Sequence, residues 1–234
     1  RDNYTFQPAT RKVEKLSFPG VPDNTIIWTF YTDKQQNFWM GSSRGLYKKS
    51  KGASTFKLYE PAALPGSNLT SNEINGILES RYNGLWLRSN NGLFFYDYAT
   101  DKIDRHGFDK LKGDVFFSQD VNAIYEDSDS ILCVCTWQGG LGKYNVRSWK
   151  IKNYTTENGL PSMSIQSILG DEENSTLWMG SFDGLIRFNT KTEQSISFSI
   201  ADGIQSQLFA DGSAVKTSNG YFAFGGSNGI TIFK

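Results

Sequence analysis

Hydrophobic and polar positions alternate along the 234-residue chain in a pattern that recurs five times. Each copy has a short apolar run that reads as a buried strand, then a Gly followed by an aliphatic residue. The copies read NFWMGSSRGLYKKS, GLWLRSNNGLFFYD, ILCVCTWQGGLGKYN, TLWMGSFDGLIRFN and YFAFGGSNGITIFK. The segments that follow, FKLYE, IDRHGF, IKNYT and SISFS, alternate as half-exposed β-strands do. The pattern therefore predicts pairs of short strands joined by tight turns.

Two columns of the repeat define its period. The tryptophan column is spaced by 47, 47, 45 and 45 residues and consists of Trp39, Trp86, Cys133, Trp178 and Ala223. The glycine column closes each turn and consists of Gly45, Gly92, Gly140, Gly184 and Gly229. We expect these glycines to have positive φ, since tight hairpin turns favour that conformation and glycine adopts it without a steric cost.

Each copy is preceded and followed by a further strand-like segment. The preceding segments, residues 27–33, 74–80, 121–127 and 165–171, are apolar and end in a small polar or acidic residue. Four short strands in roughly 45 residues are typical of a β-propeller blade. One four-stranded sheet cannot bury both of its faces, so blades pack side by side and each covers its neighbour. We expect the tryptophan column to fill the space between adjacent blades.

The repeat predicts an all-β protein made of four-stranded antiparallel blades in one β-propeller region, residues 1–234. The expected blades cover approximately residues 24–60, 72–108, 119–155, 163–199 and 207–234, and residues 1–18 read as the outer strands of a preceding blade. Both ends cut through a blade, which predicts a fragment of a longer propeller. Alternatively, residues 12–18 supply the outer strand of the fifth blade and close a five-bladed ring, which would remove exposed sheet edges.

Charge and composition exclude some partners. The chain has 24 Lys and Arg and 24 Asp and Glu, so its net charge is zero, which argues against nucleic-acid binding through this region. No apolar stretch approaches the roughly 20 residues of a membrane helix, and the polar opening RDNYTFQPAT is not a signal peptide. We expect a cytosolic chain or a mature or excised piece of a larger protein. Membrane attachment is expected only through such a parent.

The two cysteines, Cys133 and Cys135, lie two residues apart in one predicted strand. Their side chains should share a face at a spacing that does not suit a disulfide. A zinc site needs more ligands than they provide, and the one histidine, His106, falls in an outer-strand segment. We interpret both as small buried apolar side chains, with Trp137 or Trp149 filling the space that a tryptophan would occupy. No metal and no cofactor is expected.

Acidic residues recur near the end of the first strand at Asp33, Glu79, Asp127 and Asp171. A glycosidase needs two carboxylates that face each other across a substrate. However, acids favour turns because their side chains bond the local backbone. A feature that repeats in most blades is better explained by structure, and one histidine cannot furnish a Ser-His-Asp set. We therefore predict no catalytic residues and no enzymatic activity for this chain.

Candidate ligand-binding residues are those that depart from the repeat. Arg88 replaces the strand glycine of the second blade, and Asn90 and Asn91 follow it. Trp137 and Gln138 lie in a turn that is one residue longer than its counterparts. We expect these five residues to line one rim, where a tryptophan face and planar polar groups suit a sugar. Arg88 would favour an anionic sugar.

Two further candidates and one alternative remain. Trp28 and Tyr31 in the first inner strand are second-rank ligand-binding residues. In the alternative, Trp137 covers the gap beside Cys133 and the stem of Arg88 covers apolar surface. Neither residue would then contact a ligand.

The motifs LWMGSFDGLIRFNTKTE and ENGLPSMSIQSIL resemble the two-component regulator propeller repeat. The tail ADGIQSQLFADGSAVKTSNGYFAFGGSNGITIF resembles the last blade before the Ig-like domain of such receptors. Five tandem copies make the resemblance specific over nearly the whole chain. It implies part of a seven-bladed propeller from the periplasmic sensor of a Bacteroidetes hybrid two-component receptor.

The resemblance also implies a function. These receptors recognise oligosaccharides from complex glycans and signal to a histidine kinase, which these 234 residues do not contain. The resemblance further implies a homodimer in the full receptor and a periplasmic ectodomain anchored in the inner membrane. Two alternatives remain open: a polysaccharide-active propeller enzyme, either glycosidase or lyase, and a protein-docking propeller with no small ligand.

Overall fold

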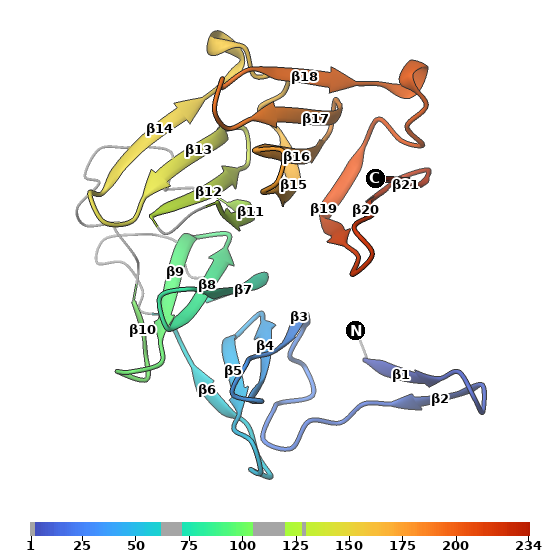
Figure 1. Ribbon diagram of the computed structural model, residues 1–234. Helices are drawn as coiled ribbons and strands as arrows, with labels where there is room; N and C mark the ends of the chain where they lie inside the picture. The colour runs from blue at the N-terminus through green and yellow to red at the C-terminus, as the bar shows by residue number, and fades with distance from the viewer. Residues whose placement is uncertain (1–2, 62–71, 105–119, 128–129) are drawn as a thin grey trace. The chain divides into compact units, whose positions relative to one another are not determined.

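The computed structural model describes residues 3–61, 72–104, 120–127 and 130–234 (Figure 1). These residues form strands and turns, and the helical segments among them are two short 3-10 helices, η2 (Thr156–Asn158) and η3 (Ile200–Asp202). The chain divides into two compact units, residues 1–106 and 107–234, here called unit 1 and unit 2. The prediction of an all-β protein is confirmed.

Unit 1 contains a two-stranded hairpin and two four-stranded antiparallel sheets. The hairpin consists of β1 (Tyr4–Gln7) and β2 (Lys12–Lys15). Blade 1 consists, in spatial order, of β3 (Ile27–Thr32), β4 (Phe38–Ser42), β5 (Gly45–Lys49) and β6 (Lys57–Tyr59). Blade 2 consists of β7 (Gly76–Ser80), β8 (Gly84–Ser89), β9 (Gly92–Asp97) and β10 (Lys102–Asp104).

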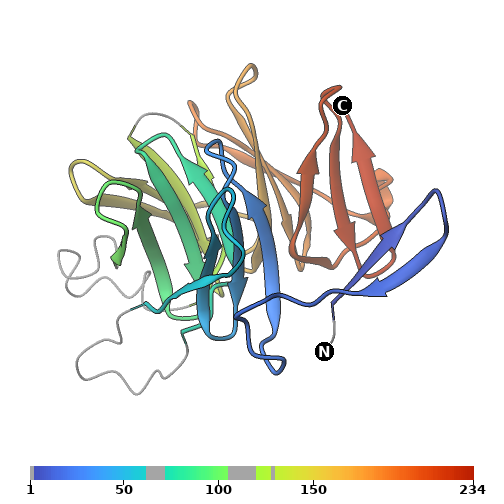
Figure 2. The same ribbon diagram turned by 90° about the horizontal axis from the view of Figure 1, so that it is seen from below.

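Unit 2 contains two four-stranded sheets and one three-stranded sheet. Blade 3 consists of β11 (Val121–Glu126), β12 (Ile131–Thr136), β13 (Gly140–Asn145) and β14 (Lys150–Tyr154). Blade 4 consists of β15 (Ile165–Asp171), β16 (Thr176–Ser181), β17 (Gly184–Asn189) and β18 (Ser195–Phe198). Blade 5 consists of β19 (Phe209–Lys216), β20 (Phe222–Gly226) and β21 (Gly229–Phe233), shown in red in Figure 2.

Successive blades pack through their first strands. In unit 1, β3 lies against β7; in unit 2, β15 lies against both β11 and β19 (Figure 1). β11 also approaches β19, although their blades are not consecutive. The first strand of each blade is therefore the inner one, as expected for a β-propeller, and the predicted fold class is confirmed.

The glycine column adopts the predicted backbone conformation. Gly45 has φ +131° and Gly140 has φ +73°. A Cβ at Gly45 would lie 2.5 Å from the carbonyl oxygen of Tyr59, and one at Gly140 would lie 2.2 Å from that of Tyr154. These turns need glycine both for its positive φ and because the outer strand of the same blade lies so close.

The tryptophan column fills the space between blades in unit 1, as predicted. Trp39 of blade 1 is fully buried and belongs to a cluster with Leu85 and Leu87 of blade 2. Its indole Nε1 donates a hydrogen bond to Asp33 Oδ2 at 2.7 Å. The Asp33 carboxylate also accepts from the Asn37 backbone N–H and side chain, which confirms its predicted turn role.

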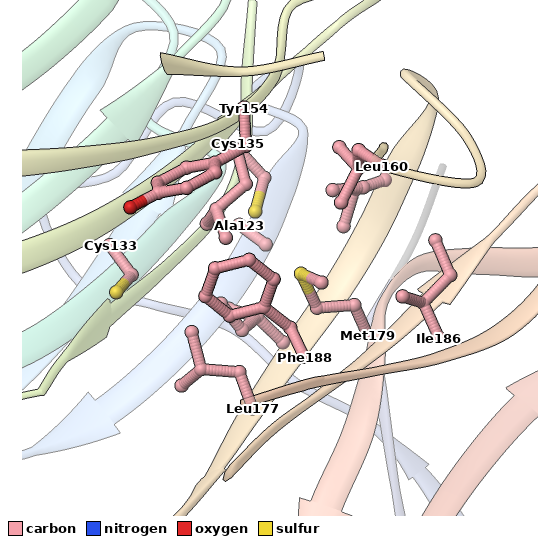
Figure 3. Packing of buried hydrophobic residues seen from close by; sticks show 12 residues of the cluster. Ala123, Cys133, Cys135, Tyr154, Leu160, Leu177, Met179, Ile186 and Phe188 are labelled. Carbon is pink, nitrogen blue, oxygen red and sulfur yellow. The ribbon is translucent and has the colours of Figure 1, made fainter. Parts of the chain in front are cut away.

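The cysteines in the same column of blade 3 are free and fully buried, as predicted. They share a hydrophobic cluster with Leu177 and Phe188 of blade 4 (Figure 3). Burial raises the pKa of the Cys133 thiol and that of the Cys135 thiol, so both remain protonated. The partly buried side chains that pack against this cluster are Tyr125 and Ile131. The tryptophans expected there lie elsewhere: Trp137 packs on Phe182, and Trp149 packs on Tyr144.

Blade 5 has three strands within the described residues, as the repeat predicts. Ile230 is 59% exposed, whereas the residues in the same column of the other blades are buried: Leu46, Leu93, Leu141 and Leu185. The hairpin strand β2 pairs with β1 in the two-stranded sheet. The five-bladed closure, the seven-bladed parent and the blade boundaries stay predictions. Residues 105–108 and 119 of those boundaries, and His106, lie outside the described residues.

Candidate functional site

One backbone hydrogen bond recurs at the same end of four blades. The first residue of the turn between the second and third strands donates its N–H to the carbonyl oxygen of the residue before the inner strand. The pairs are Ser43 to Ile26 (2.9 Å), Trp137 to Asp120 (2.9 Å), Phe182 to Ser164 (3.2 Å) and Ser227 to Leu208 (3.0 Å). Residues directly opposed in an antiparallel ladder carry their side chains on one face. The fold therefore sets the side chain of Trp137 beside that of Asp120.

Trp137 departs from its counterparts in chemistry and in exposure. Its side chain is 40% exposed and meets the half-buried Phe182 of blade 4 edge-on, with ring centroids 5.6 Å apart. The next residue, Gln138, is exposed and has φ +57°. We call Asp120, Trp137, Gln138 and Phe182 the Trp137 rim. It combines an aromatic surface with polar groups on two adjacent blades of unit 2.

The longer turn of blade 3 loses a hydrogen bond that the shorter turns make. In blade 4, Ser181 Oγ accepts from the Asp183 N–H and donates to the Gly184 carbonyl oxygen. Thr136 holds the same position in blade 3 and is 1% exposed, yet its hydroxyl has no partner among the described residues. A buried hydroxyl without a partner costs about 1–3 kcal/mol. The turn that presents Trp137 is therefore less stabilised than its counterparts.

Asp120 is a half-buried carboxylate for which the described residues supply no compensating partner. Burial raises the pKa of Asp120, and the negative charge of Asp211 raises it further. Across the part of the chain that the structure describes, no hydrogen bond or ion pair is made by this carboxylate. A ligand that donates hydrogen bonds to Asp120 would stabilise its ionised form.

Asp211 reaches this region because blade 5 departs from the regular ladder. The four residues of β19 from Ala210 to Ser213 lie between the paired positions Phe209 and Ala214 and are not paired in the ladder. Gly212, one of these four, has φ +61°. β19 also approaches β11, which begins directly after Asp120. Two carboxylates from non-consecutive blades therefore influence one another within unit 2.

In unit 1, Arg88 lies over the inner strand of its own blade. It is opposite Gly76, and a Cβ at Gly76 would fall 2.0 Å from Arg88 Nε. Blade 1 shows the reverse arrangement, with Gly41 opposite Thr29 and a Cβ at Gly41 2.7 Å from the Thr29 methyl. The arginine is therefore accommodated by a glycine on the neighbouring strand. This geometry agrees with the alternative in which the stem of Arg88 covers backbone and apolar surface.

The two asparagines after Arg88 lie within the turn. Asn90 accepts a hydrogen bond from the Asn75 side chain and donates to Glu73 Oε2 at 3.0 Å. Asn91 is buried, and its backbone N–H donates to Ser89 Oγ at 3.2 Å. The side-chain amide of Asn90 is thus already engaged, and that of Asn91 lies largely beneath the surface.

The second-rank candidates differ from each other. Trp28 is 44% exposed and is the extra residue of a β-bulge, between the paired positions Ile27 and Thr29. Tyr31 donates its hydroxyl to Glu79 Oε2 at 2.9 Å, and burial together with this carboxylate raises the pKa of Tyr31. Tyr31 therefore links blade 1 to blade 2, and Glu79 serves this link rather than a local turn.

The structure places Trp137 and Gln138 on one turn of unit 2, and Arg88, Asn90, Asn91, Trp28 and Tyr31 in unit 1. The single rim expected to combine the two sets stays a prediction. Sequence reasoning missed Asp120 and Phe182. Both could have been found from the sequence. Phe182 has the same turn position as Trp137, and Asp120 precedes the inner strand opposite Trp137.

Two kinds of feature are absent from the described residues. They contain no group of three or more His, Cys, Asp or Glu side chains placed to hold a metal ion. No helix in this part of the chain is long and apolar enough to cross a membrane.

The chain is similar to proteins of bacterial signalling systems. It is 26% identical to Histidine kinase P4 of Formosa agariphila over 243 residues, which cover 99% of the chain and 17% of that protein. Among solved structures, it matches the extracellular domain of the putative hybrid two-component system BT3049 from B. thetaiotaomicron with a TM-score of 0.74 and 21% identity. That match covers 96% of the chain and 30% of the BT3049 domain.

A second B. thetaiotaomicron structure, the extracellular domain of the putative hybrid two-component system BT4673, matches with a TM-score of 0.67 and 20% identity. That match covers 93% of the chain and 29% of the domain. The chain thus spans under a third of the length of each of these proteins. No protein-family model matches the chain.

Proposed function

We propose that this chain is part of the periplasmic sensor region of a hybrid two-component receptor and that it recognises oligosaccharides released from complex glycans. The observation that carries the proposal is the likeness of the fold, over 96% of the chain, to the extracellular domain of such a system. The histidine kinase relative from Formosa agariphila supports the same class of parent protein. The chain itself is a non-catalytic binding region.

The Trp137 rim is the proposed place of recognition. Sugars present an apolar ring face and many hydroxyl groups, so their binding sites combine an aromatic ring with hydrogen-bonding side chains. Trp137 supplies an exposed ring, and the neighbouring Asp120 and Gln138 supply polar groups. Stacking of blades requires none of these three residues, since the other blades stack with a shorter turn that lacks them.

Signalling in the proposed receptor requires two arrangements of a homodimeric ectodomain with different ligand affinities. A ligand shifts an equilibrium only by its difference in affinity for the two states. In this proposal the ligand favours the arrangement that activates the histidine kinase of the parent protein. In this proposal the chain is attached to the membrane only through other parts of the parent protein.

Titration calorimetry of the ectodomain that contains this chain, against a panel of defined oligosaccharides, tests the proposal. We expect at least one oligosaccharide to bind and Trp137→Ala to weaken it. Trp149→Ala is the matched control, because Trp149 lies in the same blade and packs on Tyr144. A panel without any binding would end the proposal, and equal effects of the two variants would remove the Trp137 rim from it.

A polysaccharide-active enzyme is the second candidate, favoured by one observation. Asp120 and Asp211 come from non-consecutive blades, and burial together with the charge of Asp211 raises the pKa of Asp120, as in carboxyl pairs that share acid and base roles. Incubation of the ectodomain with mixed glycans separates the two candidates. Released reducing ends that disappear in Asp120→Asn would replace the sensor proposal with a glycosidase.

A further inference from the structure

The Trp137 rim carries negative charge beside its aromatic surface, which bears on the chemistry of its ligand. The Asp120 carboxylate is half-buried and opposite Trp137 across the ladder. Within the described chain it has no hydrogen-bond or ion-pair partner. A carboxylate in this state accepts hydrogen bonds and repels other anions.

The second carboxylate strengthens this repulsion. Asp211 is exposed on the inserted segment of β19, and its charge acts on Asp120. Two carboxylates that influence each other create a region of negative potential. An anionic group on a ligand would enter this region at an electrostatic cost, whereas hydroxyl or ammonium groups would donate hydrogen bonds to the carboxylates.

The aromatic pair determines how a ligand would lie. Trp137 and Phe182 form a T-shaped pair with an interplanar angle of 81°, so the two rings are not stacked face to face. The side chain of Trp137 is 40% exposed, which leaves part of its surface for a ligand. A pyranose that stacks on this ring would lie beside the strand end that carries Asp120, whose backbone carbonyl oxygen accepts from the Trp137 N–H.

We propose that Asp120 and Trp137 form a subsite for a neutral or amino pyranose unit and that this subsite discriminates against uronic acids and sulfated sugars. The inference rests on the proposed oligosaccharide-sensing function and adds the class of sugar. It differs from the expectation based on Arg88, which favours an anionic ligand. Arg88 belongs to unit 1 and Asp120 to unit 2, so variants of the two residues can be compared in one experiment.

The experiment is titration calorimetry of the ectodomain with three oligosaccharide series of matched length, composed of neutral, amino and uronic acid units. We expect neutral or amino oligosaccharides to bind at least about tenfold more tightly than uronic ones, a factor that corresponds to about 1.4 kcal/mol. Trp137→Ala should weaken binding of the preferred series about tenfold or more. Asp120→Asn should reduce the preference over the uronic series, because it removes the charge and keeps the shape.

The controls separate the possible failures. Trp149→Ala and Arg88→Gln should leave affinity and preference unchanged, and far-UV circular dichroism confirms that each variant is folded. A preference for uronic oligosaccharides, or an unchanged preference in Asp120→Asn, would overturn the subsite while leaving the sensor function intact. Absence of binding in all three series would overturn both.

Discussion

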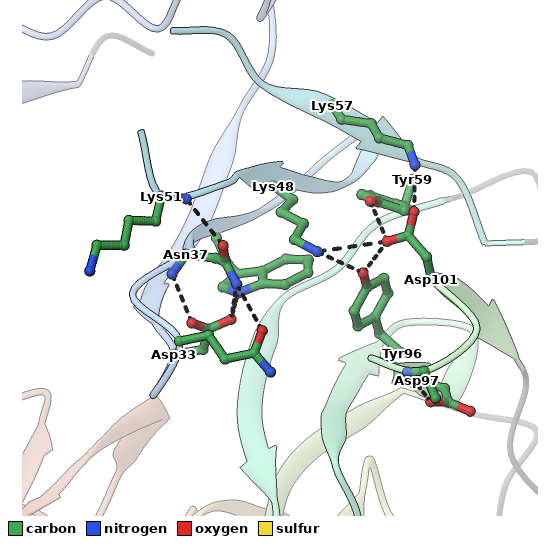
Figure 4. A network of polar contacts seen from close by, with 12 residues as sticks. Asp33, Asn37, Lys48, Lys51, Lys57, Tyr59, Tyr96, Asp97 and Asp101 are labelled. Carbon is green, nitrogen blue, oxygen red and sulfur yellow. Dashed lines mark hydrogen bonds and ion pairs between the residues drawn. The ribbon is translucent and has the colours of Figure 1, made fainter. Parts of the chain in front are cut away.

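The contact between blades 1 and 2 and the contact between blades 3 and 4 share one group of side chains at the outer strand and differ in the side chains behind it. In the first, Asp101 of blade 2 accepts hydrogen bonds from Lys57 and Tyr59 of blade 1, each at 2.7 Å (Figure 4). In the second, Glu193 of blade 4 accepts from Lys152 and from Tyr154, the latter at 2.6 Å. A lysine and a tyrosine of one outer strand thus bind a carboxylate of the next blade in both units.

The difference lies behind this shared arrangement. In unit 1, Lys48 Nζ lies 4.9 Å from the ring centroid of Trp39 and donates to the Tyr96 hydroxyl at 3.0 Å, which in turn donates to Asp101. In unit 2, Cys133 replaces the tryptophan and Phe188 replaces the tyrosine. Lys143, the counterpart of Lys48, donates instead to the Thr190 carbonyl oxygen at 3.3 Å. The contact between blades 3 and 4 therefore lacks both the indole of Trp39 and the hydroxyl group of Tyr96.

This comparison indicates that an inter-blade contact is specified by a set of positions rather than by tryptophan alone. The ring pair persists in both units, with Tyr59 and Tyr96 5.2 Å apart and Tyr154 and Phe188 4.9 Å apart. Both blades have a tyrosine of the inner strand opposite the column residue, since Tyr31 pairs with Trp39 and Tyr125 pairs with Cys133. The Tyr125 ring occupies the space that a Cβ at Gly170 of blade 4 would need. We expect this second packing to favour a small cysteine over a tryptophan.

The largest expected effect is that of Trp39→Ala. We expect a loss of about 3–5 kcal/mol in the free energy of unfolding, because a fully buried indole is removed and Asp33 loses a hydrogen-bond donor. Urea unfolding followed by far-UV circular dichroism measures it. Trp137→Ala is the control and should cost about 0.5 kcal/mol or less, since that side chain is exposed. Equal losses would contradict the structural distinction between the two tryptophans.

The next effect is that of Cys133→Trp, which restores the repeat but not the packing. We expect destabilisation by about 2 kcal/mol, because Tyr125, Leu177 and Phe188 already fill the space around the thiol. Cys133→Ala should cost about 1 kcal/mol and serves as the reference. If Cys133→Trp stabilised unit 2, the idea that a set of positions rather than tryptophan alone specifies the contact would be wrong.

A smaller effect distinguishes the two carboxylates. Asp101→Asn should lower the free energy of unfolding by about 1 kcal/mol, because the partly exposed carboxylate accepts from two tyrosines and a lysine. Glu193→Gln should cost less, since Phe188 cannot donate to it. Thermal unfolding of both variants gives the order, and a larger loss for Glu193→Gln would reverse the comparison.

The smallest effect is a dependence on pH. Burial alone would raise the pKa of Asp101, but hydrogen bonds from Lys57, Tyr96 and Tyr59 outweigh it and hold that pKa well below its usual value. A carboxyl whose folded pKa is lowered stabilises the fold above its unfolded pKa of about 3.9, and this contribution is lost as pH falls below that value. The difference between wild type and Asp101→Asn should therefore shrink from pH 6 to pH 2.5 in thermal unfolding. A difference independent of pH would show that charge is not involved.

Much of the fold could be predicted from the sequence because blade positions recur. The glycine column, the tryptophan column and the burial of Cys133 follow from alternation and from the turn that each glycine closes. The inter-blade role of Glu79 could not be predicted, since its partner Tyr31 lies 48 residues away on another blade. The position of Asp211 could not be predicted either, because it depends on an irregular segment of β19 that no other described blade repeats.

The candidate site was predicted only in part for a related reason. Trp137 and Gln138 were identifiable as departures from the repeat. Asp120 required the register of the ladder, which sets it opposite Trp137. Arg88 was also a departure, yet the structure shows that Gly76 accommodates its stem. A departure from the repeat therefore indicates a position to test, and the surrounding contacts decide between packing and binding.

The central claim is that the turn at which blade 3 differs from its neighbours binds the ligand, while the repeated positions hold the blades together. A crystal structure of the ectodomain with a bound neutral oligosaccharide tests it most directly. The account predicts a pyranose ring in contact with the Trp137 ring and a hydroxyl group within hydrogen-bond distance of Asp120. A sugar bound beside Arg88 or elsewhere, with Trp137 untouched, would contradict it.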